Sequence, residues 1–460
     1  MLAKTKGYFL KNITRFPRPI ANYILSVNRK PEMVFGKNYR KYREFLHSNY
    51  AFYNNQQKLI DSVNNAIQTI PFYHERYGNH KISSVDEFEQ TISFIDKDII
   101  LDNYHSFVNP DVSNADYDTG TTGGTSGKPL TFIAPKNRYV VELATMHSLW
   151  EQAGYQFDVR AVIRNHRLPK KKDYLINPLT REVIFDGFRL NDEYFEHIGR
   201  IISKMRIRFV HCYPSTAYEF ALYLKKRGGN YLNITAFLSG SENIFDYQRD
   251  LIEKDLGIRF YNWYGHSEKL ILAGYCEHTN LYHAEPTYGY FELIDENGEV
   301  IRKSGGFGEI VGTSFHNSGM PFIRYRTGDY AEYVGDECTV CGRRLPVFKN
   351  VKGRWSGDRI YNADGSFVTT TALNLHNDLY QVINGIQYLQ KKKGELIVLI
   401  VKSLQYTDAH EKKIYEHFAG KLHDDSKILI KYVDKLIRKP NGKFVHIISE
   451  IEQDNERLMS

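Results

Sequence analysis

The chain has 460 residues, of which 42% are hydrophobic and 25% are charged, and its formal net charge is +7. This composition excludes an intrinsically disordered chain, and the length is sufficient for two or three globular domains. The sequence has no run of 18 apolar residues and no apolar leader with a cleavage site, so we expect a cytoplasmic protein.

The first 31 residues form a basic segment. They contain seven Lys or Arg residues and no acid before Glu32, which accounts for the whole net charge. Aromatic and aliphatic residues alternate with these cations. The segment is therefore expected either to lie on the anionic inner face of a membrane or to be a helical arm docked on the protein with its lysines in solvent. Both interpretations of this arm, residues 1–37, stay open. The rest of the chain has no basic stripe, so nucleic acid is not an expected partner.

Helical periodicity dominates residues 38–70. Two short helices are expected next, with Ser83 or Ser84 and then Asp96 as their N-caps. From about residue 130 onward, patterns typical of strands and helices alternate, which predicts an α/β fold.

One βαβ unit is especially clear. An apolar strand ends at Ser239, a helix covers 246–256 and stops at Gly257, and a second strand starts at Ile258. Sheets of this type bind ligands at the carboxyl ends of their strands. The polar stretches "SGSEN" and "WYGHSE" follow the two strands, so we expect a site where they converge.

The tail, residues 358–460, is predicted to be a separate small α+β domain. "GIQYLQ", "ELIVLIVKS" and "KILIKYV" are typical of strands, and Asp408 with Glu411 predicts a capping box that opens a helix. The predicted fold is therefore a large, subdivided N-terminal domain with βαβ sheets, residues 38–357, followed by this small α+β domain.

The loop "TGGTSGKP" combines glycines, hydroxyls and one lysine directly before a strand. It is not a Walker A motif, because Thr122 stands where the first glycine belongs and Pro129 replaces the magnesium-binding hydroxyl. Glycines let backbone N–H groups turn toward a phosphate, and the hydroxyls and Lys128 add donors and charge. The loop is therefore predicted to bind phosphate in another way.

This loop is similar to the phosphate loop of the adenylate-forming superfamily of acyl-CoA synthetases. "YGHSE", "YRTGD", "GRWSGDRI" and "PNGK" follow in the same order as that superfamily's later motifs. "PFYHERYG", "FIDKDIILDN" and "CTVCGR" resemble the branch that contains phenylacetate-CoA ligase and the CapK-type proteins of capsular polysaccharide biosynthesis. The resemblance covers the chain from about residue 40.

The resemblance implies an adenylation domain, a mobile C-terminal domain and a ligase that uses ATP and Mg²⁺. Such enzymes release pyrophosphate, form an acyl-adenylate from a small carboxylic or amino acid, and pass the acyl group to an acceptor. That acceptor is an amine or amino sugar in surface polysaccharide biosynthesis, or it is CoA. The alternatives are an aryl- or acyl-CoA ligase of the phenylacetate-CoA ligase type and, more remotely, a non-catalytic nucleotide-binding protein.

The resemblance also implies a role for individual residues. The catalytic residues are Lys443, Glu268 (which also binds Mg²⁺) and Lys128. The nucleotide-binding residues are Thr122, Gly123, Gly124, Thr125, Ser126, Gly127, Ser241, Glu242, Tyr264, Gly265, His266, Ser267, Asp329 and Arg354, with Asp329 on the ribose and Tyr264 on the adenine. By family position, His211, Tyr213 and Trp263 contribute to the acid pocket.

The hinge departs from the superfamily pattern. Two adjacent acids usually follow the Gly-Arg pair, but here Trp355, Ser356 and Gly357 precede a single Asp358, which we predict to be the hinge. The sequence chooses neither the acid, the acceptor nor the oligomeric state.

Cysteine spacing predicts a second, structural site. Cys338-x-x-Cys341 is a knuckle that can offer two thiolates to Zn²⁺, and Cys276 with His278 or His283 would complete a tetrahedral set. The alternative is a set of reduced thiols without metal. The resemblance favours His283, because some members of this branch carry a Cys and His site with a histidine at that place.

Overall fold

The computed structural model describes residues 14, 17–48, 53–113, 115–122, 130–169, 172–353, 359–369, 373, 375, 379, 382–437 and 446–451. Within these residues, no helix is both long enough and apolar enough to cross a membrane.

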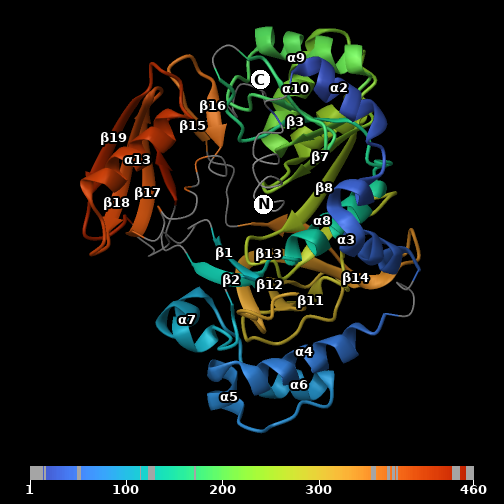
Figure 1. Ribbon diagram of the computed structural model, residues 1–460, viewed down its shortest axis with the longest axis vertical. Coiled ribbons are helices and arrows are strands. Elements are labelled where there is room, and N and C mark those ends of the chain that lie inside the picture. The colour runs from blue at the N-terminus through green and yellow to red at the C-terminus, as the bar shows by residue number, and fades with distance from the viewer. Residues whose placement is uncertain are drawn as a thin grey trace.

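Helices dominate the N-terminal part. Ser84 and Asp96 cap α6 and α7, because their side chains accept hydrogen bonds from the backbone N–H groups of Glu87 and Ile99. Figure 1 shows α4 to α6 grouped at one end of the molecule. The helices of this part are α2 (Arg18–Val27), α3 (Pro31–Ser48), α4 (Asn55–Thr69), α5 (Pro71–Tyr77), α6 (Val85–Thr91), α7 (Lys97–Asp102) and the 3-10 turn η3 (Tyr104–Phe107).

A 12-stranded sheet forms the centre of the protein, in the order β11-β12-β13-β14-β10-β9-β8-β7-β6-β3-β5-β4. Its strands are β3 (Arg160–Ile163), β4 (Leu175–Asn177), β5 (Glu182–Phe185), β6 (Phe209–Cys212), β7 (Ala236–Gly240), β8 (Arg259–Gly265), β9 (Leu272–Tyr275), β10 (Tyr282–Ala284), β11 (Gly289–Ile294), β12 (Phe307–Ser314), β13 (Tyr325–Glu337) and β14 (Arg344–Lys352). The segment β5-β3-β6-β7-β8 is parallel, and the strands beyond β8 pair antiparallel.

The predicted βαβ unit is present. Strand β7 connects to β8 through α11 (Asp246–Arg249) and a π-helical turn, η4 (Asp250–Asp255), and Gly257 ends the crossover with φ of 65°. The crossover packs with α9 (Asp192–Met205) and α10 (Pro214–Lys226) in one apolar core under the parallel strands. Helix α8 (Arg138–Glu151) contributes to the other core, and a hairpin of β1 (Tyr117–Thr121) and β2 (Thr131–Pro135) precedes it.

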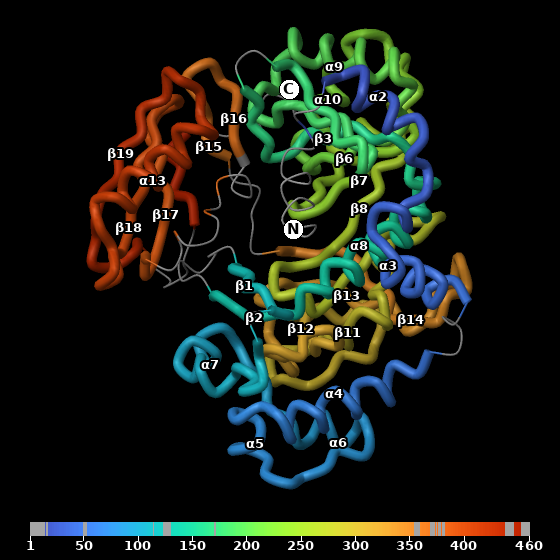
Figure 2. The backbone as a smooth tube through the Cα atoms, in the orientation of Figure 1, coloured from blue at the N-terminus to red at the C-terminus, as the bar shows by residue number. Residues whose placement is uncertain are grey.

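The C-terminal residues form a smaller α+β unit, as predicted. Figure 2 shows this C-terminal unit beside the N-terminal part of the chain, with β15 and β16 on the side that faces the N-terminal part. Its main sheet has the order β19-β18-β17-β20. The elements are β15 (Arg359–Tyr361), β16 (Phe367–Thr369), β17 (Ile383–Lys392), β18 (Glu395–Lys402), α13 (Asp408–Ala419), β19 (Lys427–Tyr432) and β20 (Ile447–Ser449).

The expected capping box at Asp408 and Glu411 is wrong by one residue. Thr407 is the N-cap, because its backbone is extended (φ −132°, ψ 166°) whereas Asp408 is the first helical residue. The Nδ1 atom of His410 accepts a hydrogen bond of 3.1 Å from the backbone N–H of Thr407. The partner in the box is therefore His410, which a Ser/Thr-to-Glu pattern does not reveal.

Several contacts join the two parts of the chain. Phe188 packs in the apolar core of the C-terminal unit, and Arg167 donates a hydrogen bond of 2.6 Å to the Leu422 carbonyl. Arg359 lies 3.6 Å from Glu219 of α10. These contacts fix one arrangement of the C-terminal unit against the large sheet.

Candidate active site and metal centre

The predicted site residues gather where the parallel strands end. His211 lies in β6 and Tyr213 follows it, Ser241 and Glu242 follow β7, and Trp263 lies in β8. Because these strands are adjacent and parallel, their carboxyl ends form a single edge of the sheet. The prediction that the two polar stretches converge is therefore confirmed in space, although "WYG" belongs to β8 itself.

Tyr264 and Asp329 meet at this edge. The Tyr264 hydroxyl donates a hydrogen bond of 3.0 Å to Oδ2 of Asp329, and both side chains are buried. Asp329 lies in β13, where its backbone N–H donates to the Thr327 hydroxyl. Close to it in the same strand, Arg326 makes two hydrogen bonds to Glu309 of β12, at 2.8 and 2.6 Å. Arg326 therefore joins two neighbouring strands of the sheet.

Glu268 is a buried carboxylate, only 3% exposed, held from two sides. Oε1 accepts a hydrogen bond of 3.1 Å from the Tyr325 hydroxyl, and Oε2 lies 3.1 Å from Nδ1 of His266. Gly265 ends β8, and Ser267 is exposed between His266 and Glu268. A carboxylate fixed in this way is a suitable oxygen ligand for Mg²⁺, which takes one or two carboxylates and keeps several waters.

Arg164 contacts three residues of the candidate site and was missed by the sequence analysis. It follows β3 and donates hydrogen bonds to Nε2 of His211 at 2.7 Å and to the Ser241 hydroxyl at 3.2 Å. Its guanidinium lies 4.3 Å from the ring centroid of Tyr213. Burial, together with the charge of Arg164, holds the pKa of His211 well below its ordinary value, so this imidazole is neutral.

A local signal for Arg164 was present in the sequence, since it directly follows a buried apolar strand. Ser241, which it contacts, has φ of 73°, a left-handed conformation that is costly for a side chain other than glycine. Such conformations cluster at functional sites. Glu242, in contrast, accepts a hydrogen bond of 3.0 Å from the Ser215 backbone N–H at the start of α10.

Thr122 closes the base of the glycine-rich loop. Its backbone N–H donates to the Leu130 carbonyl at 2.8 Å, and its hydroxyl accepts from the Leu130 N–H at 3.1 Å. The remaining predicted residues lie outside the described residues, and their roles stay predictions. They are Gly123, Gly124, Thr125, Ser126, Gly127, Lys128, Arg354, Asp358 and Lys443.

The predicted metal ligands come together from two hairpins. Cys276 follows β9, His283 lies in β10, and Cys338 and Cys341 lie in the connection between β13 and β14. Their ligand atoms all lie within 4.8 Å of one another, and the Cys338 and Cys276 sulfurs are 3.9 Å apart. Three thiols and one imidazole fit the tetrahedral donor set of structural Zn²⁺. The geometry selects His283 over His278.

His283 is available as a ligand. Its Nε2 atom is buried and has no hydrogen-bond partner among the described residues. Burial and the charge of Arg343 lower the pKa of His283 to about 4, so the ring is in the neutral form that binds metals. Only two residue pairs join β10 to β14, so a metal here would cross-link the sheet where that pairing is short.

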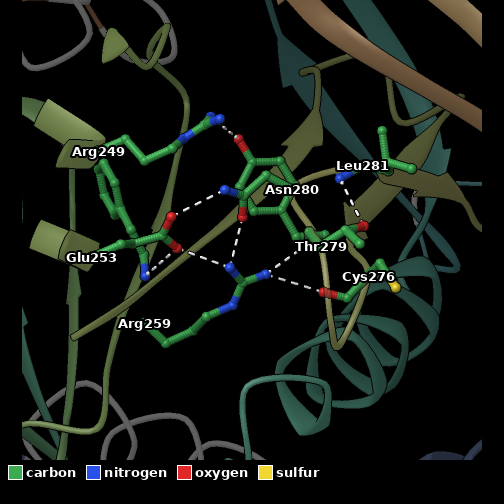
Figure 3. Close-up of polar contacts among 9 residues, drawn as sticks. Arg249, Glu253, Arg259, Cys276, Thr279, Asn280 and Leu281 are labelled. Atoms are coloured by element: carbon green, nitrogen blue, oxygen red, sulfur yellow. Dashed lines mark hydrogen bonds and ion pairs between the residues drawn. The ribbon is translucent and has the colours of Figure 1, made fainter. Parts of the chain in front are cut away.

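Arg259 fastens the loop that carries Cys276, as Figure 3 shows. Its guanidinium donates to the backbone carbonyls of Cys276 at 3.1 Å and of Thr279 at 2.8 Å. It also bonds to Glu253 at 2.8 Å and to the Asn280 side chain at 2.6 Å. These bonds preorganise the Cys276 backbone, in the way that outer-shell groups support metal ligands.

Comparisons with known proteins agree with this fold. Residues 360–450 match the profile of the CapK C-terminal domain. The chain is 22% identical to protein CapK of Staphylococcus aureus over 346 residues, which are 72% of this chain and 74% of that protein.

Two solved structures of 2-hydroxyisobutyryl-CoA ligase share the fold. The one in the postadenylation state superposes with a TM-score of 0.52 and 15% identity, covering 86% of this chain and 89% of that one. The one with 2-HIB-AMP and CoA in the thioesterification state gives a TM-score of 0.54 and 16% identity, covering 91% and 94%. The chain thus carries a match to the CapK C-terminal domain, resembles protein CapK over most of its length, and shares the fold of an acyl-CoA ligase.

Proposed function

We propose that this protein is an AMP-forming ligase that activates a carboxylic acid as an acyl-adenylate and transfers the acyl group to an acceptor. The observation that carries the proposal is the convergence of Glu268, Asp329 and Tyr264 at the carboxyl edge of the parallel strands. A non-catalytic protein that only bound nucleotide would need a carboxylate for the ribose, the role proposed for Asp329. It would not need a second carboxylate held in place for a metal ion, the role proposed for Glu268.

The buried carboxylates suit two different parts of ATP. Asp329 would accept hydrogen bonds from the two ribose hydroxyls, because a carboxylate offers two acceptor oxygens to a vicinal diol. Tyr264, bonded to Asp329, would present its ring to the adenine. Glu268 would hold Mg²⁺, which neutralises phosphate charge, while His266 and Tyr325 keep the carboxylate in place.

The reaction joins two anions, so the protein must offset their repulsion. The glycine-rich loop with Lys128 would bind the leaving pyrophosphate, and Lys443 would bridge the acid's carboxylate and the α-phosphate. Arg164, His211, Tyr213 and Trp263 lie at the same edge and would line the acid pocket. Attack of a carboxylate oxygen on the α-phosphorus then gives acyl-AMP and pyrophosphate, and the acceptor displaces AMP.

The acceptor that we propose is an amine or amino sugar of a surface polysaccharide, with CoA as the alternative. The similarity to protein CapK and the match to the CapK C-terminal domain support the amine or amino sugar. The similarity in fold to the CoA-bound 2-hydroxyisobutyryl-CoA ligase supports CoA as the alternative. An enzyme that modifies membrane-borne glycan intermediates would work beside a membrane.

We also propose a peripheral membrane contact through the N-terminal arm. Helix α2 packs Ala21 and Leu25 against Ile176 of β4. Its other side exposes Ile20, Tyr23 and Val27 at 50%, 69% and 58%. An exposed apolar stripe in a segment without acids before Glu32 is suited to anionic lipid. Replacing all three with Ser should reduce flotation with phosphatidylglycerol vesicles, and unchanged flotation would refute this contact.

The test of the proposed reaction is pyrophosphate release with ATP and Mg²⁺ across a panel of carboxylic and amino acids. Mass spectrometry would detect acyl-AMP, and added CoA or amino sugars would identify the acceptor. Acid-dependent pyrophosphate release is expected, and K443A should suppress it far more than it weakens ATP binding. ATP hydrolysis that is independent of every acid would contradict the proposal, as would K443A forming adenylate at the parental rate.

A further inference from the structure

A cavity of about 540 Å³ opens at the start of α8. Pro135, Val141 and Phe315 give it apolar walls, and Tyr117, Arg138 and His316 are among its polar residues. A pocket of this size accommodates a small molecule. It lies where the β1–β2 hairpin, which carries the glycine-rich loop, passes into α8.

Arg138 is a buried cation in the wall of this cavity. It is only 7% exposed, and its guanidinium carbon lies over the rings of Phe132 and Tyr139, at 5.2 and 4.7 Å from their centroids. Nη2 donates to the Tyr139 hydroxyl at 3.2 Å. Within the described part of the chain, Nε and Nη1 have no hydrogen-bond partner. A buried charge without an anion is costly, so this arrangement calls for a ligand.

The neighbouring groups do not supply that anion. Glu142 lies one helical turn further along α8, but its carboxylate accepts a hydrogen bond of 2.5 Å from Lys269. Asp116 in the cavity wall accepts a hydrogen bond from the Ser113 hydroxyl at 3.3 Å and, within the described residues, makes no ion pair with Arg138. Burial lowers the pKa of His316, whose Nε2 contacts the Thr287 carbonyl at 2.8 Å, so this ring adds no charge.

Lys136 adds a second cation to the same wall, where its ammonium donates a hydrogen bond of 2.7 Å to the Ala115 carbonyl. Helix α8 itself contacts the candidate active site. Lys269, the residue after Glu268, donates a hydrogen bond of 2.5 Å to Glu142 of α8, which is one helical turn from Arg138.

We propose that Arg138 recognises a second anionic group, a carboxylate or phosphate, on the acid that the enzyme activates. This inference rests on the proposed function and narrows the substrate to a dianionic class. The Nε and Nη1 atoms of Arg138, which have no hydrogen-bond partner among the described residues, can each donate a charge-assisted hydrogen bond to an anionic group. The alternative is that Arg138 is held only by its aromatic neighbours and binds no ligand. In that case kcat/KM would not depend on a second negative charge on the acid.

The test compares acids that differ only in the distant group: succinate, succinamate and butyrate, with glutarate and valerate as a second pair. Acid-dependent pyrophosphate release gives kcat/KM for each. We expect the diacids to exceed the neutral analogues by about tenfold or more, as for a charge-assisted pair. R138M should abolish this preference while sparing the monoacids, R138K should restore part of it, and R344M, which changes an exposed arginine, should leave it intact.

Equal kcat/KM for diacids and monoacids in the parent protein would overturn the proposal, and that comparison needs no variant to fold. If R138M changed only the rate of acyl transfer to the acceptor and not the rate of adenylation, the anionic group that Arg138 recognises would not belong to the acid, and the proposal would be overturned. Calorimetry without ATP separates this proposal from the proposed function. If no acid is activated, succinate binding that R138M abolishes still supports the anion site, and binding unaffected by R138M refutes it.

Discussion

The hydroxyl of Tyr264 donates a hydrogen bond of 3.0 Å to the carboxylate of Asp329, although the two residues are 65 positions apart in the chain. One lies in the last parallel strand, β8, and the other in β13 of the antiparallel half of the sheet. The bond therefore joins the two halves at the candidate nucleotide site and fixes the carboxylate that would bind the ribose.

Replacing Tyr264 with Phe should weaken ATP binding. The change removes one hydrogen bond to a buried carboxylate, an interaction of about 1.5–3 kcal/mol, so the Kd for ATP should rise about tenfold or more. Calorimetric titration with ATP measures it. Y415F, which removes an exposed hydroxyl on α13, is the matched control. An unchanged Kd for ATP would show that the hydrogen bond from Tyr264 to Asp329 does not contribute to nucleotide binding.

Replacing Glu268 with Gln should suppress adenylation with little change in shape. The amide cannot neutralise a metal ion, so pyrophosphate release should fall by about 100-fold, comparable to the loss of one preorganised electrostatic group. The Mg²⁺ concentration for half-maximal rate should rise. E277Q alters a glutamate with an exposed side chain and is the control. Parental rates and Mg²⁺ dependence in E268Q would remove Glu268 from the proposed site.

The purified protein should contain about one zinc ion per chain, held by Cys276, His283, Cys338 and Cys341, since these supply the four ligands of one structural site. C338S should lose the metal and unfold at a temperature lower by several degrees, because β10 and β14 would lose their cross-link. Elemental analysis and thermal unfolding measure this. C212A, outside the cluster, should keep the zinc. Absence of metal from carefully purified parent protein would refute the site.

The C-terminal unit should lose stability in mild acid. Burial and the charge of Lys97 lower the pKa of His446 to about 3, against an ordinary value of 6.5. Between these values the unfolded chain binds a proton that the folded chain does not. The contribution of His446 to stability is therefore complete above pH 6.5 and declines as the pH falls toward 3.

Urea unfolding at pH 7.5 and 5.0 measures this decline. H446F keeps a ring that can stack on Tyr388, as His446 does at 4.9 Å between centroids, but it has no titrating group. The free energy of unfolding of H446F should therefore fall less between the two pH values than that of the parent. H278N, at an exposed histidine, should behave as the parent does. Equal declines in all three proteins would contradict the assignment.

Local patterns were sufficient for much of the fold. Apolar periodicity predicted the strands of the βαβ unit and of the C-terminal unit, and the caps Ser84 and Asp96 were identifiable because an N-cap bonds within three residues. Thr407 was missed because the distinction between cap and first helical residue depends on one pair of backbone angles. The π-helical turn before β8 likewise has no sequence signature.

The sequence by itself determined the order of motifs, the residue types at the candidate site and the inventory of metal ligands, because these depend on neighbours along the chain. Only the tertiary structure decided that His283 rather than His278 joins the cysteines, that Arg164 bridges His211 and Ser241, and that Arg138 is buried beside a cavity. Each of these depends on contacts between distant strands or helices, whose register and packing fix distances that no local pattern encodes.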